Sequence, residues 1–235
     1  TSQYTLSLHD ALPISGTRTV TIAPEAGSDE LRRIIGKPTS VEALRRAASV
    51  LADAGIPRLK LYFMVGLPGE QERDVAAIAD LTGELLDVFA SGRSGARVSV
   101  GASPFVPKPR TPFQWMPAPE RKLVRDRISR LRRKLARMRR IPFTSAGPRE
   151  AEREAVLARG GRELAIAIRA AGVDRVPIRA ALKRSGVDLR RELHRERSED
   201  EVFPWELVEA GTPKSALLAS YRKARVLMDA RPSSD

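Results

Sequence analysis

Three short segments contain the residue types that could hold a nucleoside. Glu25, in the segment APEAGS, can accept hydrogen bonds from two sugar hydroxyls, as an acidic residue does for a ribose in dinucleotide-binding folds. Gly66 and Gly69, in VGLPGE, permit a tight turn that Pro68 restricts, and its backbone N–H and C=O groups could pair with the edge of a flat heterocycle. The third segment, SPFVPKPRTP, is too rich in proline to continue a helix or a strand ladder.

Two alternatives stay open for these segments. Glu25 could simply cap the helix that begins at Ser28, and its spacing to that helix does not decide between capping and ribose binding. The glycine-proline turn is common in loops. Neither G-x-x-x-x-G-K-S/T nor G-x-G-x-x-G occurs in the chain, which argues against the phosphate-binding loops that those motifs build.

The elements around the three segments predict an α/β fold. Strands are expected within 18–24, 61–65 and 97–106, separated by helices that start at Ser28, at Thr39 or Ser40, and after Glu70. The run from Leu61 to Val65 has no polar interruption, which is typical of a strand covered on both faces in a parallel sheet. Because parallel strands end at the same edge of a sheet, the three segments should line one mouth.

Beyond Pro119 we expect helices and no further strand. Residues 121–140 predict one long helix, whose apolar seam recurs every three or four residues and packs on the sheet. Its many arginines are expected to form a solvated face. The alternative, an RNA-binding accessory domain, is less favoured because no aromatic residues are interleaved for base stacking. His194 is expected to be solvated and without a partner, within a mostly helical region from 148 to 235.

Composition excludes several kinds of site. The chain of 235 residues contains no cysteine and two histidines, so its own side chains are not expected to hold a zinc ion, a disulfide or an iron-sulfur cluster. The net charge of +13 is compatible with nucleic-acid binding, but an Arg- and Ala-rich composition accounts for it equally well. No apolar run approaches the roughly 18 residues of a membrane-spanning helix, and we expect a cytoplasmic protein.

The first fifteen residues, TSQYTLSLHDALPIS, differ in character from the rest of the chain. They have neither the basic start nor the apolar stretch of a signal peptide. The string resembles translated sequencing-adapter readthrough, so we expect 1–15, His9 included, to be a non-native leader. On that expectation the natural sequence starts near Gly16, and an upstream part of the protein is missing.

Three longer strings carry a resemblance to a known family. They are APEAGSDELRRIIGK, KLYFMVGLPGE and SVGASPFVPKPRTPFQW, in this order and spacing. Together they resemble the later half of the radical S-adenosylmethionine (radical SAM) enzymes, and more narrowly the subgroup with an upstream cobalamin-binding domain. The resemblance covers roughly 18–115, and the segment 203–224 is similar to the closing segment of the same subgroup.

The resemblance implies a partial (β/α)6 TIM-like barrel, of which residues 16–117 would be the C-terminal half with three parallel strands, followed by a basic helical region, 118–235. Such enzymes use a [4Fe-4S] cluster to cleave S-adenosylmethionine to a 5'-deoxyadenosyl radical, and the substrate of this one is not implied. The matching positions that would bind the cofactor are Glu25, Gly27, Ser28, Met64, Val65, Gly66, Leu67, Pro68, Phe105 and Val106.

This sequence also departs from the family pattern. Arg110 stands where the family's P-x-P-G-T-P motif has glycine, at a turn that calls for a positive φ. The cluster-binding C-x-x-x-C-x-x-C segment does not occur in the chain, so these residues alone are expected to be inactive and to need the upstream part of their own chain as a partner. A third possibility is half of a barrel from a cluster-free enzyme that binds another nucleotide.

Overall fold

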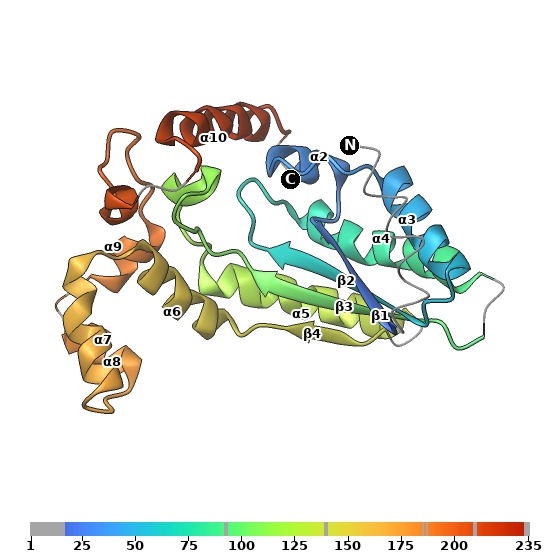
Figure 1. Ribbon diagram of the computed structural model, residues 1–235, viewed down its shortest axis with the longest axis horizontal. Coiled ribbons are helices and arrows are strands. Elements are labelled where there is room, and N and C mark those ends of the chain that lie inside the picture. The colour runs from blue at the N-terminus through green and yellow to red at the C-terminus, as the bar shows by residue number, and fades with distance from the viewer. Residues whose placement is uncertain are drawn as a thin grey trace.

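The computed structural model describes residues 17–91, 94–138, 141–184, 186, 188–208 and 211–232 (Figure 1). The strands are β1 (Thr19–Glu25), β2 (Arg58–Val65), β3 (Arg97–Pro104) and β4 (Phe143–Ser145). The helices are α2 (Asp29–Ile34), α3 (Val41–Asp53), α4 (Glu72–Ala90), α5 (Arg121–Arg137), α6 (Pro148–Arg159), α7 (Ala165–Gly172), α8 (Ile178–Arg184), α9 (Leu189–His194) and α10 (Lys214–Asp229). Short 3-10 turns are η1 (Pro112–Trp115), η2 (Arg162–Leu164) and η3 (Pro204–Leu207).

The strands of the described residues form one parallel sheet in the order β1-β2-β3-β4. Each of the first three strands is followed by helices before the next strand begins, as parallel pairing requires. The predicted α/β class is therefore confirmed, and the architecture agrees with part of a TIM-like barrel.

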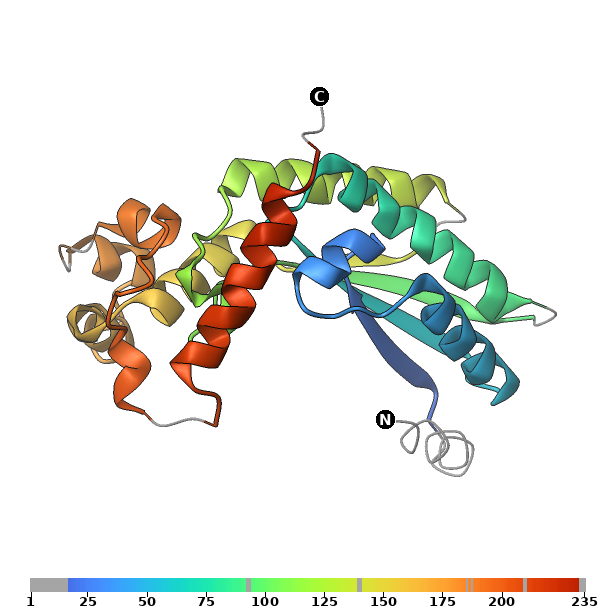
Figure 2. The same ribbon diagram turned by 90° about the horizontal axis from the view of Figure 1, so that it is seen from above.

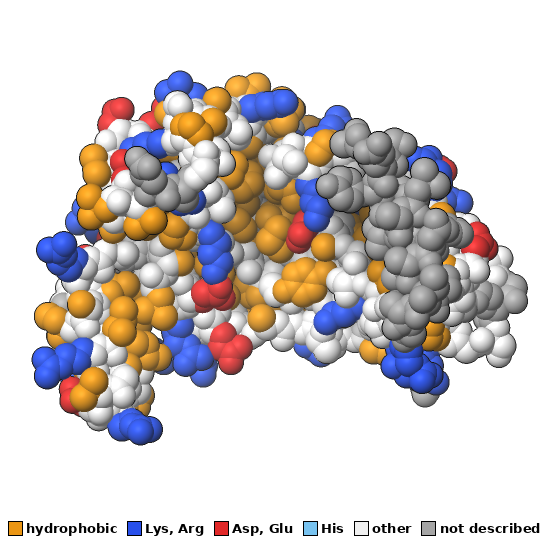
Figure 3. All heavy atoms as spheres, viewed as in Figure 1, with side chains coloured by type: hydrophobic (Ala, Val, Ile, Leu, Met, Phe, Trp, Pro, Cys, Tyr) orange, Lys and Arg blue, Asp and Glu red, His pale blue; other side chains and the backbone are white. Residues whose placement is uncertain are grey.

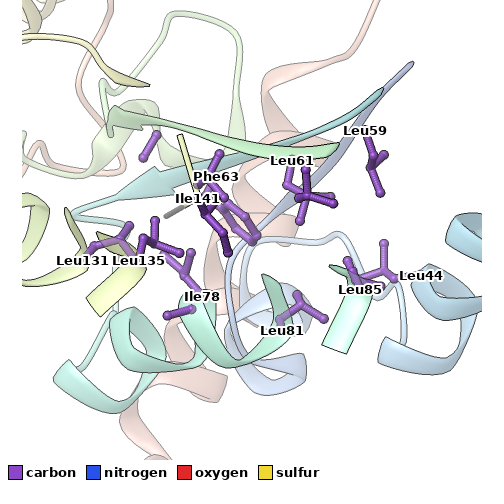
Figure 4. Close-up of a cluster of buried hydrophobic side chains, with 14 of the residues drawn as sticks. Leu44, Leu59, Leu61, Phe63, Ile78, Leu81, Leu85, Leu131, Leu135 and Ile141 are labelled. Atoms are coloured by element: carbon purple, nitrogen blue, oxygen red, sulfur yellow. The ribbon is translucent and has the colours of Figure 1, made fainter. Parts of the chain in front are cut away.

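The side chains of β2 show how the sheet is covered on one face. Leu59, Leu61, Phe63 and Val65 alternate along the strand and are fully buried. They form the sheet core with apolar residues of α3, α4, β3 and α5. Figure 4 shows the β2 side chains directed from the sheet toward those helices. Burial of this continuous apolar layer stabilises the fold and holds the strand ends in position.

The other face of β2 differs from the expectation. Tyr62 and Met64, which we expected to be covered like their neighbours, are half-buried, and Lys60 on the same face is also half-buried. Figure 1 shows β2 and β3 in front of α4 and α5, and Figure 3 shows hydrophobic side chains gathered over the sheet in that view, with charged side chains among them. The prediction that both faces of β2 are covered was wrong for the described residues. Tyr62 and Met64 were counted as apolar, and this hid the alternation of buried and half-buried positions along the strand.

Helix α5 confirms the predicted seam and corrects the prediction for its arginines. Val124, Ile128, Leu131 and Leu135 are buried in the sheet core. Arg127, however, is buried rather than solvated, with 7% of its surface exposed, because it points toward the turn after β2 and binds acidic groups there.

A fourth strand corrects the expectation that strands end at Pro119. Phe143–Ser145 pairs in parallel with β3, with Val100 opposite Phe143 and Ala102 opposite Ser145. A strand of three residues has too little hydrophobic periodicity to be recognised in the sequence. Its position after α5 extends the βαβ pattern by one more unit.

The C-terminal helix covers the carboxyl ends of the strands. Figures 1 and 2 show α10 passing across this end of the sheet, and its apolar face packs on η1 and on the turns after β1, β2 and β3. We call this group of buried residues the rim cluster. It comprises Ala26, Leu31, Ile34, Leu67, Phe105, Phe113, Trp115, Phe203, Leu217, Tyr221 and Ala224. Trp115 is fully buried, and its ring centroid lies 5.7 Å from that of Phe203 and 5.3 Å from that of Tyr221.

A separate helical group formed by α6, α7, α8 and α9 has its own small core, which includes Val156, Leu164, Leu182 and Leu193. Of the helices that the structure describes, none combines the length and the apolar character needed to cross a membrane. The expected leader, with His9, lies outside the described residues.

The position of α5 on the sheet can be tested with two leucines of the same helix. We expect Leu135→Ala to lower the free energy of unfolding by about 3 kcal/mol, because Leu135 is fully buried and the truncation leaves a cavity. Leu123→Ala is the control, because Leu123 is 39% exposed and should change stability by less than about 0.5 kcal/mol. Urea unfolding followed by circular dichroism measures both, and equal effects would contradict the packing of α5 described above.

Candidate functional site

The turns after β1, β2 and β3 meet at one edge of the sheet, as the sequence predicts. Because β1, β2 and β3 are parallel neighbours, their carboxyl ends lie side by side. The amide of Phe105 donates to the carbonyl oxygen of Val65 at 2.8 Å, which ties the turn after β3 to the end of β2. Ala26, Leu67 and Phe105, one from each turn, share the rim cluster.

Glu25 has an unusual backbone conformation at the end of β1. Its φ is 69°, in the left-handed region that residues with a side chain rarely adopt, and the pairing of β1 with β2 is irregular between Ile22 and Glu25. The side chain is 23% exposed, and its Oε1 accepts a hydrogen bond from the Nζ of Lys37 at 3.1 Å. Backbone strain of this kind costs about 1 kcal/mol or more and is concentrated at functional sites.

Ser28, not Glu25, caps helix α2. The Oγ of Ser28 accepts a hydrogen bond from the amide of Leu31 at 3.1 Å, which is the bond that an N-cap side chain makes. Glu25 instead pairs with Lys37. The alternative in which Glu25 caps the helix was therefore wrong.

Gly27 is required by close packing against α4. A Cβ atom at this position would lie 2.4 Å from the carbonyl oxygen of Asp74 and 2.4 Å from the amide nitrogen of Ile78. Because these are backbone atoms of a helix, they cannot move aside cheaply. The glycine thus brings the turn after β1 into contact with the start of α4.

Asp74 joins that turn to the C-terminal end of α10. Its carboxylate accepts hydrogen bonds from both terminal nitrogens of Arg231, each at 2.9 Å, from the amide of Gln71 at 2.7 Å and from the hydroxyl of Ser28. Arg231 also donates to the carbonyl oxygen of Gly69 at 2.6 Å. Burial alone raises the pKa of Asp74, but the bonds from Arg231, Ser28 and Gln71 outweigh it, so this pKa lies below its usual range.

The buried side chain of Glu70 stabilises the turn after β2 by accepting a hydrogen bond from its backbone. Its side chain is 1% exposed and its Oε2 accepts from the amide of Gly66 at 2.7 Å and from Nη1 of Arg127 at 2.8 Å. Gly66 and Gly69 have φ of 84° and 73°, which only glycine adopts easily. Since the Gly66 amide already has a partner, it is not free to bind a heterocycle. Burial raises the pKa of Glu70 to about 7, against the opposing effects of Arg127 and the Gly66 amide.

The remaining predicted residues divide between three environments. The face of β2 opposite the sheet core, which carries Lys60, Tyr62 and Met64, is called the open face here. Met64 is half-buried on it and packs against the rim cluster, which includes Leu67 and Phe105. Val65 is fully buried in the sheet core, while Val106 packs against the separate core of α6 to α9. The buried Pro68 lies between the two glycines of the turn. The structure thus brings Met64, Leu67 and Phe105 together and places the side chains of Val65 and Val106 elsewhere.

The turn after β3 has the backbone conformation expected from the sequence. Arg110 has a φ of 59°, although it is not glycine. Its amide donates to the Oε1 of Gln114 at 3.1 Å, and its guanidinium donates to the carbonyl oxygen of Val208. These bonds hold the strained residue in place.

Three polar residues on the half-buried face of the sheet were not singled out from the sequence. Lys60, Tyr62 and Ser103 lie on the open face of the sheet, and the hydroxyls of Tyr62 and Ser103 form a hydrogen bond. Tyr62 is one strand position before Phe63, which lies in register with Glu25. The sequence would have predicted this half-buried face of β2 if Tyr62, which has a polar hydroxyl, had been counted as partly polar when every second residue was compared.

The described residues do not contain a metal centre. No group of three or more histidine, cysteine, aspartate or glutamate side chains in the described part of the chain could hold a metal ion. The side chains present therefore do not fit an iron-sulfur cluster, which requires cysteine thiolates in most proteins. His194 is not solvated as expected: its Nδ1 lies 3.0 Å from the carbonyl oxygen of Ala118, and its Nε2 lies 3.8 Å from a carboxylate oxygen of Glu120.

The packing of Gly27 leads to a first prediction for the site. We expect Gly27→Ala to destabilise the protein by on the order of 3 kcal/mol, because the new methyl group meets the backbone of α4. Gly172→Ala is the matched control, since nothing lies within 4 Å of a Cβ atom there. Thermal unfolding compares the two variants, and a Gly27→Ala protein as stable as the control would show that α4 can move away from the turn.

The buried pair of Glu70 and Arg127 predicts a pH-dependent effect. The folded-state pKa of Glu70, about 7, exceeds the 4.5 that is usual for a glutamate in water, so its contribution to stability is fully present below pH 4.5 and is lost as the pH rises through about 7. Arg127→Met removes the cation and raises this pKa further. The loss of stability should therefore be small at pH 5 and reach roughly 3 kcal/mol at pH 8, where Glu70 of the folded variant must either stay ionised without its partner or take up a proton.

Urea unfolding at both pH values tests the role of Arg127. Arg130→Met serves as the control, because Arg130 lies on the same helix but is 58% exposed in its pair with Glu72. It should cost less than about 1 kcal/mol at either pH. A cost for Arg127→Met that is the same at pH 5 and pH 8 would contradict the coupling to Glu70.

Comparison with known proteins finds a family similarity in a part of the chain that includes two of these strand ends. Residues 8–82 match the Radical SAM superfamily, a range that includes Glu25 and the turn after β2. The chain is also 34% identical over 105 residues to "Uncharacterized protein MJ0966" of Methanocaldococcus jannaschii, a match that covers 45% of this chain and 22% of that protein. The chain thus spans about a fifth of the length of this relative. No solved structure matches the chain. The segment from residue 8 to residue 82, which builds β1, β2 and most of α4, is similar to the Radical SAM superfamily.

Proposed function

We propose that the turns after β1, β2 and β3 form the nucleoside-binding side of a radical SAM site. The superfamily match supports this proposal, since it spans two of the three turns. The open face of the sheet supports it as well, because it places polar and apolar side chains beside the strand ends, where α/β proteins bind their ligands.

The strained position of Glu25 is the observation that carries the proposal. Its carboxylate has no role in capping α2, and its cationic partner Lys37 is itself 41% exposed. A half-buried carboxylate at the mouth can accept hydrogen bonds from two vicinal hydroxyls of a ribose, or one from the amino group of S-adenosylmethionine. The fold maintains an uncommon backbone conformation at this residue, which is what a positioned binding group requires.

Met64 and Phe105 are the side chains best placed to flank the base. Met64 lies half-buried on the open face and Phe105 is 7% exposed in the rim cluster at the end of the neighbouring strand. Gly27 and Ser28 act by fixing the turn that presents Glu25. The Gly66 turn acts through its shape, because its amide is already bonded to Glu70.

A [4Fe-4S] cluster would supply the electron that cleaves S-adenosylmethionine to a 5'-deoxyadenosyl radical. The cysteines that bind such a cluster would have to come from outside these 235 residues, which contain none. We therefore assign no catalytic step to the side chains described here. The cobalamin-associated subgroup, the need for an upstream part of the chain and the cytoplasmic location are proposals that rest on the sequence resemblance.

Binding of S-adenosylmethionine tests the proposal without requiring the cluster. We expect the chain to bind S-adenosylmethionine in calorimetric titration, and Glu25→Gln to weaken binding about tenfold or more, since a hydrogen bond to a charged group contributes about 1.5 kcal/mol or more. Glu42→Gln is the control for the loss of one negative charge, because Glu42 is 66% exposed, pairs with Arg46 of the same helix and should leave the affinity unchanged.

Two results would contradict this function. One is the absence of binding at millimolar S-adenosylmethionine by a wild-type chain that unfolds cooperatively. The other is an affinity of the Glu25→Gln variant equal to that of the Glu42→Gln variant, which would remove Glu25 from the site.

A further inference from the structure

A second candidate site lies apart from the strand ends. A cavity of about 830 Å³ opens between the start of α5 and helices α6, α8 and α9. This volume lies within the range of roughly 300 to 1,000 Å³ that is usual for pockets that bind small organic molecules. We call this space the basic cavity. Its role does not depend on the proposed radical SAM function.

The wall of the basic cavity carries a large excess of positive charge. Seven lysine or arginine side chains line it, against the two carboxylates of Glu120 and Glu152. One of these carboxylates is already engaged, because Oε1 of Glu152 pairs with Nε of Arg121 at 2.8 Å. The potential in the cavity therefore favours an anion.

Three of the arginines have no acidic partner. In the part of the chain that the structure describes, Arg149, Arg179 and Arg190 form no ion pair and no side-chain hydrogen bond. They come from α6, α8 and α9, three different helices that converge on the cavity. Unpaired arginines also occur elsewhere on the described surface, for example Arg33, Arg58 and Arg97, so the distinguishing feature of these three is that they line one cavity. Like charges that line one wall repel one another, and a bound anion would reduce that repulsion.

The floor of the basic cavity is apolar. Val156, Leu182 and Leu193 are buried there, and Leu189 is half-buried beside them. Because the first three are already buried, the apolar surface of these four residues that still contacts water belongs chiefly to Leu189. An inorganic ion would leave that surface hydrated, whereas a ligand with both an anionic head and an apolar body would cover it and gain roughly 25 cal/mol for each Å² of apolar surface removed from water.

The lining argues against nucleic acid as the ligand. None of the residues that line the cavity is phenylalanine, tyrosine or tryptophan, so the wall lacks the side chains on which unpaired bases usually stack. Guanidinium groups from several directions suit a phosphate group, which carries more charge than a carboxylate and has three terminal oxygens that accept bidentate hydrogen bonds.

We propose that the basic cavity binds an organic phosphate monoester with an apolar body. Arg149, Arg179 and Arg190 bind the phosphate, and Leu182, Leu189 and Leu193 contact the hydrocarbon part. The site lies beside the segment that joins β3 to α5, so its ligand would be held outside the mouth formed by the strand ends.

Calorimetric titration with three probes tests the chemistry of this site. We expect hexyl phosphate to bind at least tenfold more tightly than inorganic phosphate, because only the ester also covers the apolar floor. Hexyltrimethylammonium, which has the same apolar chain and the opposite charge, should not bind. Equal affinities for hexyl phosphate and inorganic phosphate would overturn the proposal, as would binding of the cation.

Matched variants test the residues. We expect the combined substitution Arg149→Gln, Arg179→Gln and Arg190→Gln to weaken hexyl phosphate at least tenfold. The control is Arg33→Gln, Arg58→Gln and Arg97→Gln, which removes the same charge from exposed arginines that lie outside the cavity. Leu189→Asn should weaken hexyl phosphate and leave the affinity for inorganic phosphate unchanged.

Circular dichroism melting establishes that each variant is folded before titration. If the triple variant does not fold, Arg179→Gln compared with Arg33→Gln gives the same test with a smaller expected loss, about threefold. Equal affinities in the cavity variant and its control would overturn the proposal. So would displacement of hexyl phosphate by a short single-stranded RNA at lower concentration than inorganic phosphate, since that result would assign the surface to nucleic acid.

Discussion

The buried ion pair between Asp74 and Arg231 connects more parts of this molecule than any other contact described above. Both side chains are almost inaccessible, at 1% and 2% exposed, and the arginine binds the carboxylate through two nitrogens. Through Asp74 the pair reaches Ser28 in the turn after β1, and through Arg231 it reaches Gly69 in the turn after β2. A buried charge without its partner is costly, so the geometry of these two turns and the position of α10 are coupled. The turns that form the mouth of the site are therefore fixed by Arg231, which follows α10, as well as by the sheet.

A second buried carboxylate, that of Glu70, explains why the predicted site is more closed than its sequence suggests. A glycine-proline turn was expected to offer free backbone groups, but the turn after β2 directs its Gly66 amide inward to Glu70. In the proposed function, recognition at this edge would therefore depend on side chains such as Glu25 and Met64 more than on exposed backbone. A rigid turn that satisfies its own polar groups is well suited to support such side chains, because it does not rearrange when a ligand binds.

Local signals in the sequence predicted the elements well, and long-range contacts account for what was missed. Ser28 is an N-cap, Gly36 and Gly55 follow helices with positive φ, and the seam of α5 packs as its spacing indicates. Each of these follows from residues within one or two helical turns. Arg32 and Arg127 are buried, which no local pattern reveals in a chain so rich in arginine: Arg32 donates to the carbonyl oxygens of Ala26, Gly27 and Thr39, and Arg127 reaches a residue 57 positions away. For the candidate site, the sequence predicted that Glu25 and Phe105 follow neighbouring strand ends at one edge of the sheet, as they do in the structure, but it could not show which backbone groups were already bonded.

The distance along the chain between Asp74 and Arg231 has a consequence for biosynthesis. The two residues are 157 positions apart, whereas the helices that pack beneath the sheet all follow their strands closely in the sequence. While a ribosome is making the protein, α4 can already pack on β2, but the carboxylate at its start must stay hydrated until α10 has emerged. The sheet and its helices should therefore form early in translation, and the strand-end turns should acquire their final order only once α10 is available to pack on them.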